Sequence, residues 1–145
     1  MNILAVTPIR PGTIIAPCNL DKIPRLISEL VPVHDAREVN ININRARLQK
    51  MFVDKYFGLY DFVLLLDSDV AVDYQTVQLL VDAWKPGTVP CANTKGMQTD
   101  HVVASCALIS RVDYRNVDYV TNLYTCQCMK LPNTFYVKGA LAKEI

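Results

Sequence analysis

The sequence lacks a strong excess of charge, and it also lacks any apolar run long enough to cross a membrane. Its formal net charge is +1 at pH 7, so composition gives no reason to expect nucleic acid or an acidic membrane as a partner. No apolar run approaches the roughly 20 residues that a membrane-spanning helix needs. The N-terminus lacks the basic segment of a signal peptide. These absences predict a cytoplasmic protein.

The number and spacing of the cysteines exclude complete internal pairing and disfavour a zinc site. The chain has five, an odd number, so they do not all pair within it. Several lie inside apolar runs, which suits buried thiols in a reducing compartment. The Cys-Gln-Cys sequence at 126–128 has no second cysteine pair to complete a zinc site.

The chain does have enough apolar residues for a core. They make up 51% of the sequence, against 20% charged residues, which favours a packed globule over a disordered chain. We find no repeat, linker or low-complexity segment. At this length, 145 residues, the prediction is a single domain spanning 1–145.

Predicted strands and helices alternate along the chain. Apolar residues at helical spacing indicate the helices, and short apolar runs bounded by turn residues indicate the strands. Strands are predicted at 2–7, 31–35, 61–67, 88–92, 101–109 and 134–137, and helices at 19–30, 42–60, 73–84 and 111–124. The pattern predicts an α/β domain, a three-layer αβα sandwich around a mostly parallel mixed sheet.

The most informative segment is DFVLLLDSDVAV, residues 61–72. A continuous apolar strand ends in Asp67 and Asp69, whose side chains point to the same side of an extended chain. Two such carboxylates repel each other unless a cation lies between them. Mg²⁺ binds in this way, with one or two carboxylates and substrate phosphates. The alternative is a solvated turn in which Asp69 or Asp73 only caps the next helix.

Two arginines are predicted close to a helix start. Arg45 and Arg47 lie in or near the first turn of the helix expected from about residue 43, where a cation opposes the helix dipole. An anion nearby would reverse that penalty, and arginine suits bidentate binding of phosphate or carboxylate. The alternative is a surface ion pair with Asp35 or Glu38. Both interpretations hold if Arg47 bridges to Asp67 or to a bound diphosphate.

Together these segments resemble the metal-dependent nucleotide-sugar glycosyltransferases of the A fold, which are Rossmann-like. Ala46-Arg47 is similar to a segment that opens a helix in that family, although Leu48 stands where the family has Asn. LDSDV, residues 66–70, matches the family's Asp-x-Asp motif, and SCALISR, residues 105–111, loosely matches a later strand. The likeness covers roughly residues 2–120.

The resemblance implies a site, a cofactor and a donor. Asp67 and Asp69 would hold Mn²⁺ or Mg²⁺, and the donor would be a UDP- or GDP-sugar. The residues implied to contact that nucleotide-sugar are Thr7, Pro8, Arg10, Asp35, Arg47 and Ser68.

The sequence departs from the family pattern in its last third. The family commonly has an acidic pair there, but residues 122–130 contain no Asp or Glu. Asp100 and His101 are the nearest candidates for a general base. The chain is also short for the family. The acceptor is therefore unknown, and a homo-oligomer or a partner chain is a candidate to complete the acceptor side.

Two other functions stay open. Phosphohydrolases of the haloacid dehalogenase type also carry an Asp-x-Asp after an apolar strand, although theirs follows the first strand of the fold. A nucleotide-binding module that has lost catalysis also fits, because no clear base is present.

Overall fold

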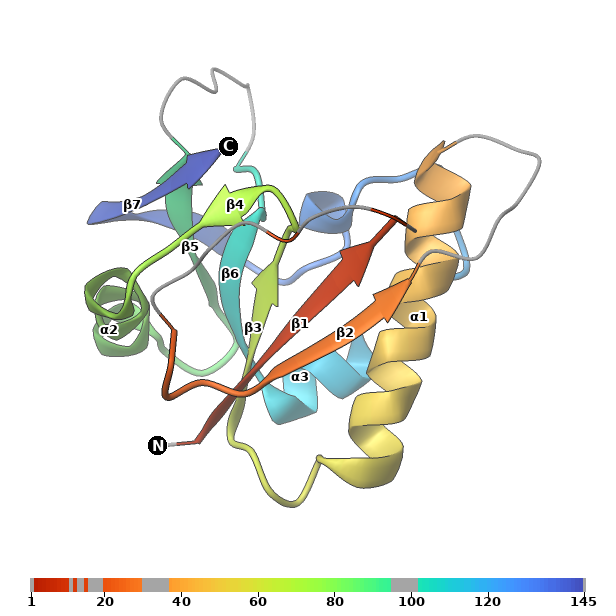
Figure 1. Cartoon of the computed structure of the whole chain (residues 1–145), viewed down its shortest axis with the longest axis horizontal. Helices are drawn as coiled ribbons and strands as arrows, with labels where there is room; N and C mark the ends of the chain where they lie inside the picture. The colour runs from red at the N-terminus through yellow and green to blue at the C-terminus, as the bar shows by residue number, and fades with distance from the viewer. Residues whose placement is uncertain are drawn as a thin grey trace.

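The computed structural model describes residues 2–10, 12, 15, 20–29, 37–94 and 102–144, and of residues 37–40 it describes only the backbone. The described strands form one seven-stranded sheet in the order β2-β1-β3-β6-β5-β7-β4 (Figure 1). In chain order the elements are β1 (Ile3–Ile9), β2 (Arg25–Glu29), α1 (Arg37–Lys55), β3 (Phe62–Leu66), β4 (Val70–Ala71), α2 (Tyr74–Ala83), β5 (Val89–Thr94), β6 (Cys106–Ser110), α3 (Arg111–Asn116), the 3₁₀ helix η1 (Gln127–Met129) and β7 (Thr134–Glu144).

The sheet is mixed, as predicted, but parallel pairs do not dominate it. The pairs β1–β2, β1–β3 and β5–β7 are parallel. The pairs β3–β6, β5–β6 and β4–β7 are antiparallel. The α/β class is therefore confirmed, while the expected predominance of parallel strands is wrong because β6 runs against both of its neighbours.

Strand β3 lies in the interior of the sheet, and all five of its residues are buried. Val63 and Leu65 join an apolar cluster that includes Phe52 of α1 and Tyr114 of α3. Phe62, Leu64 and Leu66 join a second cluster with Val77 and Leu80 of α2. The strand has apolar partners on both faces, which explains why its sequence is continuously apolar rather than alternating.

Helix α2 forms where the sequence predicted it. Asp73 caps it, since its Oδ1 accepts a hydrogen bond of 2.8 Å from the amide of Thr76. Trp84 ends it. Asp73 thus supplies a hydrogen-bond acceptor to one of the first helix amides, which have no partner within the helix.

The predicted helix at 19–30 is wrong, because residues 25–29 form strand β2. This strand pairs in parallel with β1, with Ala5 opposite Arg25 and Ile9 opposite Glu29. The spacing of Leu20, Ile23 and Leu26 fits a helix, but pairing with the edge of β1 satisfies the backbone of 25–29 instead. The predicted strand at 31–35 lies outside the described residues.

Helix α1 begins at Arg37, five residues before the predicted start at 42. Asn42 and Asn44, which looked like capping residues, are fully buried inside it. Arg45 and Arg47 are consequently more than two turns inside the helix, so the argument from the dipole at a helix start is wrong for both.

Other predicted bounds need correction. The helix predicted at 111–124 ends at Asn116, the strand predicted from 101 begins at Cys106, and the last strand continues to Glu144. Strand β4 was not predicted. Cys126 and Cys128 form a disulfide, so the expectation of reduced thiols is wrong for this pair.

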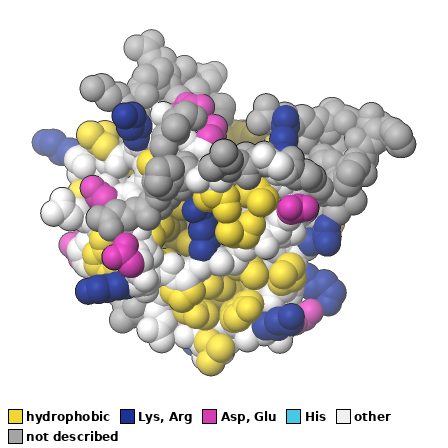
Figure 2. All heavy atoms as spheres, in the orientation of Figure 1, with side chains coloured by type: hydrophobic (Ala, Val, Ile, Leu, Met, Phe, Trp, Pro, Cys, Tyr) yellow, Lys and Arg dark blue, Asp and Glu magenta, His cyan; other side chains and the backbone are white. Residues whose placement is uncertain are grey.

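The charges on one face of the molecule and the character of the helices can be described directly. Figure 2 shows Lys, Arg, Asp and Glu side chains mixed around a central group of hydrophobic ones, with no large area of one charge on this face. None of the helices in the described part of the chain has both the length and the apolar character of a membrane-spanning helix.

Candidate functional site

The two aspartates lie at the carboxyl end of β3, directly after Leu66. The amide of Asp67 donates to the carbonyl of Ser105 at 3.0 Å, and its carbonyl accepts from the amide of Val70 at 3.3 Å. The chain thus turns tightly between β3 and β4. Asp69, in this turn, is exposed. The short strand β4 then pairs with the end of β7, which fixes the far side of the turn.

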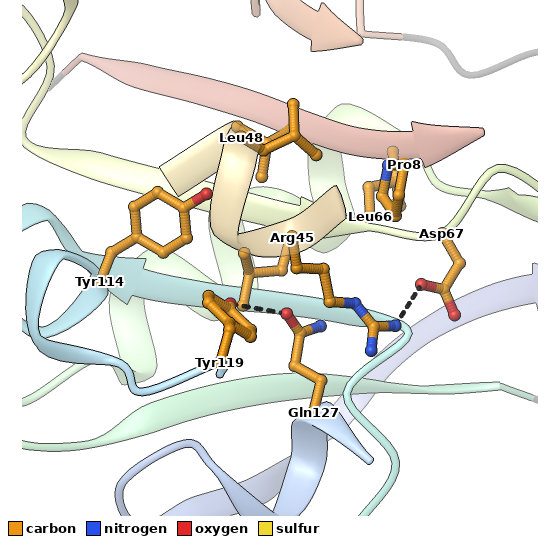
Figure 3. Close-up of a pocket in the computed structure, with 10 residues that line it drawn as sticks. Pro8, Arg45, Leu48, Leu66, Asp67, Tyr114, Tyr119 and Gln127 are labelled. Carbon is orange, nitrogen blue, oxygen red and sulfur yellow. Dashed lines mark hydrogen bonds and ion pairs between the residues drawn. The ribbon is translucent and has the colours of Figure 1, made fainter. Parts of the chain in front are cut away.

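Arg45 of α1 faces Asp67 across the end of β3. Its Nη2 lies 3.9 Å from Oδ1 of Asp67, and Figure 3 shows the guanidinium pointing at the carboxylate. The side chain of Arg45 is only 13% exposed, while that of Asp67 is 37% exposed. The structure therefore brings together the predicted Asp67 and an arginine of the predicted helix. That arginine is Arg45, whereas Arg47 is exposed.

Two side-chain amides of α1, the buried Asn42 and the partly buried Gln49, bind backbone carbonyls of distant segments. Asn42 Nδ2 donates to the carbonyls of Leu123 and Thr125 at 2.7 and 2.8 Å, and its Oδ1 accepts from Arg45 Nη1 at 3.4 Å. Gln49 Nε2 donates to the carbonyl of Tyr114 at 2.8 Å. Because Arg45 and Asn42 lie on the same helix, the hydrogen bonds of Asn42 couple the position of Arg45 to the segment around Leu123 and Thr125, which leads into η1.

A cavity of about 240 Å³ opens beside this ion pair. Its polar lining comes from Arg45, Asp67, Ser105 and Gln127, and the Cys126–Cys128 disulfide forms part of its wall. A deeper and much smaller cavity of about 10 Å³ includes Pro8 of β1. Pro8, which the resemblance implied at the nucleotide-sugar site, thus lines the same small cavity as Asp67.

Gln127 and Tyr119 form a buried pair at the floor of the site. The Tyr119 hydroxyl donates to Gln127 Oε1 at 2.8 Å (Figure 3). Burial raises the pKa of Tyr119 well above its ordinary value, even though the nearby Arg45 lowers it. The hydroxyl therefore keeps its proton at neutral pH and orients the Gln127 amide. Neither residue is predicted from the sequence, because only the fold carries residues 119 and 127 to the end of β3.

The remaining predicted residues have different fates. Thr7 is fully buried, and its Oγ1 accepts a hydrogen bond of 2.7 Å from Arg25 Nε, so it faces the protein interior. Arg10 is exposed just beyond β1, and Ser68 is partly buried between the two aspartates. Asp35, Asp100 and His101 lie outside the described residues.

The residues present suit a metal ion only as a partial site. Among the described residues, no three His, Cys, Asp or Glu side chains gather as a metal-binding group. Asp67 lines the cavity, and Asp69 follows it in the exposed turn. Carboxylate oxygens are the hard ligands that Mg²⁺ or Mn²⁺ prefers, together with substrate phosphates and waters. An ion held by these two residues would therefore have to be shared with a ligand.

The comparisons with known proteins concern the fold. No protein-family model and no curated protein matches the sequence. Among the solved structures that match is a glycosyltransferase involved in the glycosylation of the major capsid of PBCV-1, with a TM-score of 0.59 and 12% identity over 99% of this chain and 93% of that chain. A197 from STIV matches with a TM-score of 0.52 and 15% identity over 94% of this chain and 81% of that chain.

This chain shares its fold with a glycosyltransferase. At such identities the likeness shows the fold alone, but it extends over almost the whole of both chains. The α/β architecture expected from the resemblance is thus confirmed at that level. The site described above lies beyond the carboxyl ends of β1 and β3, where sheets of this kind bind their ligands.

Proposed function

We propose that this chain transfers a sugar from a nucleoside-diphosphate sugar to an acceptor, within one nucleotide-sugar-binding domain spanning residues 1–145. The observation that carries the proposal is the opposition of Arg45 and Asp67 at a cavity beyond the end of β3. The fold shared with a solved glycosyltransferase supports the class of reaction.

Arg45 is the group that would bind the diphosphate. A guanidinium has five N–H donors, yet the described contacts of Arg45 are long, at 3.4 Å to Asn42 and 3.9 Å to Asp67. Because these contacts compensate the charge of a mostly buried guanidinium only weakly, Arg45 favours binding of an additional anion. The two oxygens of a phosphate match its planar donors. Arg45 would therefore hold the leaving group and offset the negative charge that develops as the sugar departs.

Asp67 and Asp69 would hold Mn²⁺ or Mg²⁺ together with that diphosphate. The ion would supply a Lewis acid for the leaving group. The carboxylates themselves would keep the site selective, because without a cation they repel an anionic ligand. Binding of the nucleotide is therefore expected to depend on a divalent cation.

The cavity would take the sugar. Its volume of about 240 Å³ is below the range of about 300–1,000 Å³ that is usual for drug-sized ligands, so it fits one part of the donor rather than all of it. Ser105 and Gln127 supply polar groups along its wall. Asp100 and His101 stay the candidates for a general base, and a second chain stays a candidate for the acceptor side.

The test is release of UDP or GDP from a panel of nucleotide-sugars, with and without Mn²⁺. We expect slow, Mn²⁺-dependent release that falls more than tenfold in Asp69→Asn. The matched control is Asp82→Asn, because Asp82 is an exposed residue of α2 that accepts a hydrogen bond only from Gln78 among the described residues.

Two outcomes would favour the alternatives. Binding of nucleotide without any release would indicate a module that has lost catalysis. Hydrolysis of a generic phosphoester, lost in Asp67→Asn, would indicate a phosphohydrolase. Either result would overturn the proposed transfer reaction.

A further inference from the structure

The cavity of the candidate site has a disulfide in its wall that the proposed function does not use. Cys126 and Cys128 line this cavity together with Arg45 and Asp67. Both cysteines are partly exposed. A reagent that enters the cavity therefore meets the sulfur–sulfur bond directly.

The disulfide closes a very small loop, because only Gln127 separates its two cysteines. A disulfide stabilises a fold mainly by restricting the unfolded chain, and this effect decreases as the closed loop becomes shorter. A bond across one residue therefore adds little to the stability of the whole domain. Stabilisation accounts poorly for such a bond, whereas control of the residue that it encloses requires this short spacing.

The enclosed residue, Gln127, connects the disulfide to the site. Its side chain is buried, and its Oε1 accepts the hydrogen bond from the Tyr119 hydroxyl (Figure 3). Gln127 lines both the cavity of about 240 Å³ and the smaller one that includes Asp67. Its carbonyl accepts a hydrogen bond of 2.9 Å from the Lys130 amide. A change in the backbone at 126–128 therefore acts directly on a residue of the site wall.

The thiol of Cys91 has surroundings of the opposite kind. Cys91 is a fully buried free thiol, and burial raises its pKa to about 12. It is therefore unreactive near neutral pH, because the thiolate is the form that takes part in thiol–disulfide exchange. Cys126 and Cys128 instead share their cavity with the guanidinium of Arg45, and a cation favours the thiolates that form when the bond opens.

We propose that the Cys126–Cys128 disulfide is a redox-active site, which exchanges with a dithiol and in its oxidised form holds Gln127 in the wall of the cavity. A thiolate of the dithiol attacks one sulfur, the bond between the two cysteines breaks, and the other cysteine leaves as a thiolate. The second thiol of the reagent then attacks the mixed disulfide and releases the first cysteine. The protein gains two electrons and two protons, and the dithiol loses them as it becomes a disulfide.

The reaction is expected to be reversible and to affect the site. The Cα atoms of Cys126 and Cys128 are 5.6 Å apart, within the usual range of about 4.4–6.8 Å, so the bond re-forms without movement of the backbone. In the reduced form nothing joins the two sulfurs, and the backbone around Gln127 gains freedom. A weaker hold on a ligand of the cavity should follow, and this last step alone rests on the proposed function.

The first experiment follows the exchange in the folded protein. The protein is treated with increasing concentrations of dithiothreitol, its thiols are blocked with iodoacetamide, and the labelled cysteines are identified by peptide mass spectrometry. We expect Cys126 and Cys128 to be labelled together while the buried Cys91 stays unlabelled. Oxidised glutathione, added after the dithiol is removed, should abolish the labelling. The emission of Trp84, the only tryptophan of the chain, should show that the fold persists.

The second experiment measures the hold on Gln127 by hydrogen exchange, which needs no ligand. The amides of Met129 and Lys130 donate to the carbonyls of Cys126 and Gln127. We expect these amides to exchange roughly threefold faster or more in reduced protein and in the double variant Cys126→Ser, Cys128→Ser. Cys91→Ala is the control, because it leaves the disulfide intact and should respond to reduction as the wild type does.

Three results would overturn the proposal. They are a disulfide that resists dithiothreitol until the protein unfolds, loss of the fold on reduction, and equal amide exchange in the oxidised and reduced forms. Calorimetry with UDP and GDP in the presence of Mn²⁺ separates this proposal from the proposed function. We expect the double serine variant to bind roughly threefold more weakly or worse than the oxidised protein. Absence of nucleotide binding by both, with the redox response intact, would contradict the transfer reaction and leave the redox site standing.

Discussion

The two ends of β3 present opposite chemistry, although five residues separate them. At the carboxyl end, Asp67 faces a mostly buried Arg45 held by long contacts, beside a cavity of about 240 Å³. At the amino end, a cavity of about 690 Å³ is lined by Phe62, Trp84 and Arg111, and the guanidinium of Arg111 donates to the Phe57 carbonyl. From Asp61 to Asp67 the strand spans roughly 20 Å, at about 3.3 Å per residue. One buried strand thus has the candidate site at one end and a second cavity at the other.

The comparison teaches that charge alone does not reveal what a site binds. Both ends carry two carboxylates and one arginine. At the carboxyl end the arginine is poorly compensated, so it favours an anion, and the carboxylates favour a shared cation. At the amino end Arg111 donates to the Phe57 carbonyl and lies over the Phe57 ring, so its guanidinium is directed at a neutral part of the protein rather than at a carboxylate.

The largest expected effect comes from the middle of β3, which supports both ends. Leu64 is fully buried, and we expect Leu64→Ala to lower the free energy of unfolding by about 2–5 kcal/mol. Nucleotide binding at the carboxyl end of β3 should weaken in this variant as well. Urea unfolding, followed by titration with nucleotide, checks this. A loss of less than about 1 kcal/mol would show that the middle of β3 does not support the candidate site.

A smaller effect is expected at the carboxyl end alone. Asn42→Ala removes the hydrogen bonds from a fully buried amide to the carbonyls of Leu123 and Thr125, and we expect this loss to cost about 1–3 kcal/mol. Thermal or urea unfolding measures the loss. The fluorescence of Trp84 in the folded protein should not change, since Trp84 packs against a different apolar cluster from α1. A loss below 0.5 kcal/mol would show that these bonds do not hold the wall.

The next prediction distinguishes the two arginines of α1. Arg45→Met should weaken nucleotide binding roughly tenfold or more, while its effect on stability stays below about 1 kcal/mol, because Asp67 is 37% exposed and solvent screens the pair. Arg47→Met should change neither, since Arg47 is exposed. Calorimetry of both variants is the measurement. The reverse pattern would restore the assignment that the sequence suggested.

The last prediction concerns the effect of pH on stability through a buried thiol and two buried tyrosine hydroxyls. The effect is the smallest of the four at neutral pH and becomes larger in alkaline solution. Burial raises the pKa of the Cys91 thiol to about 12, and it raises the pKa values of Tyr114 and Tyr119 as well. The folded state thus keeps these protons at pH values where the unfolded state releases them. Stability from this source is complete below about pH 9 and should fall as the pH rises toward 12. Chemical unfolding at several pH values tests this, and a flat profile up to pH 12 would contradict it.

The sequence predicted the parts of the fold that depend on local chemistry. Strand β3 was found because a strand covered on both faces is continuously apolar. Helix α2 was found because Asp73 and the Lys-Pro-Gly turn mark its ends. Residues 25–29 were misread, because their apolar spacing is compatible with a helix and only the exposed edge of β1 makes them a strand. The start of α1 was placed too late, at 42, because nothing local shows that the amides of Asn42 and Asn44 bind distant carbonyls from inside the helix.

The same distinction holds for the candidate site. The position of Asp67 and Asp69 at a strand end follows from the sequence alone. The choice of Arg45 over Arg47 depends on how α1 is rotated against the sheet, which α1's tertiary contacts set. Gln127, Tyr119 and the Cys126–Cys128 disulfide reach the site through a segment with little regular structure. No local pattern could place them there.

The most direct test of the central claim is calorimetric titration with UDP and with GDP, each in the presence and absence of Mn²⁺, for wild-type protein and Asp69→Ala. We predict that wild-type protein binds at least one of the two only with Mn²⁺, and that Asp69→Ala loses this binding while it unfolds within about 0.5 kcal/mol of the wild type. Unchanged affinity in Asp69→Ala, or binding that does not need the ion, would contradict the account.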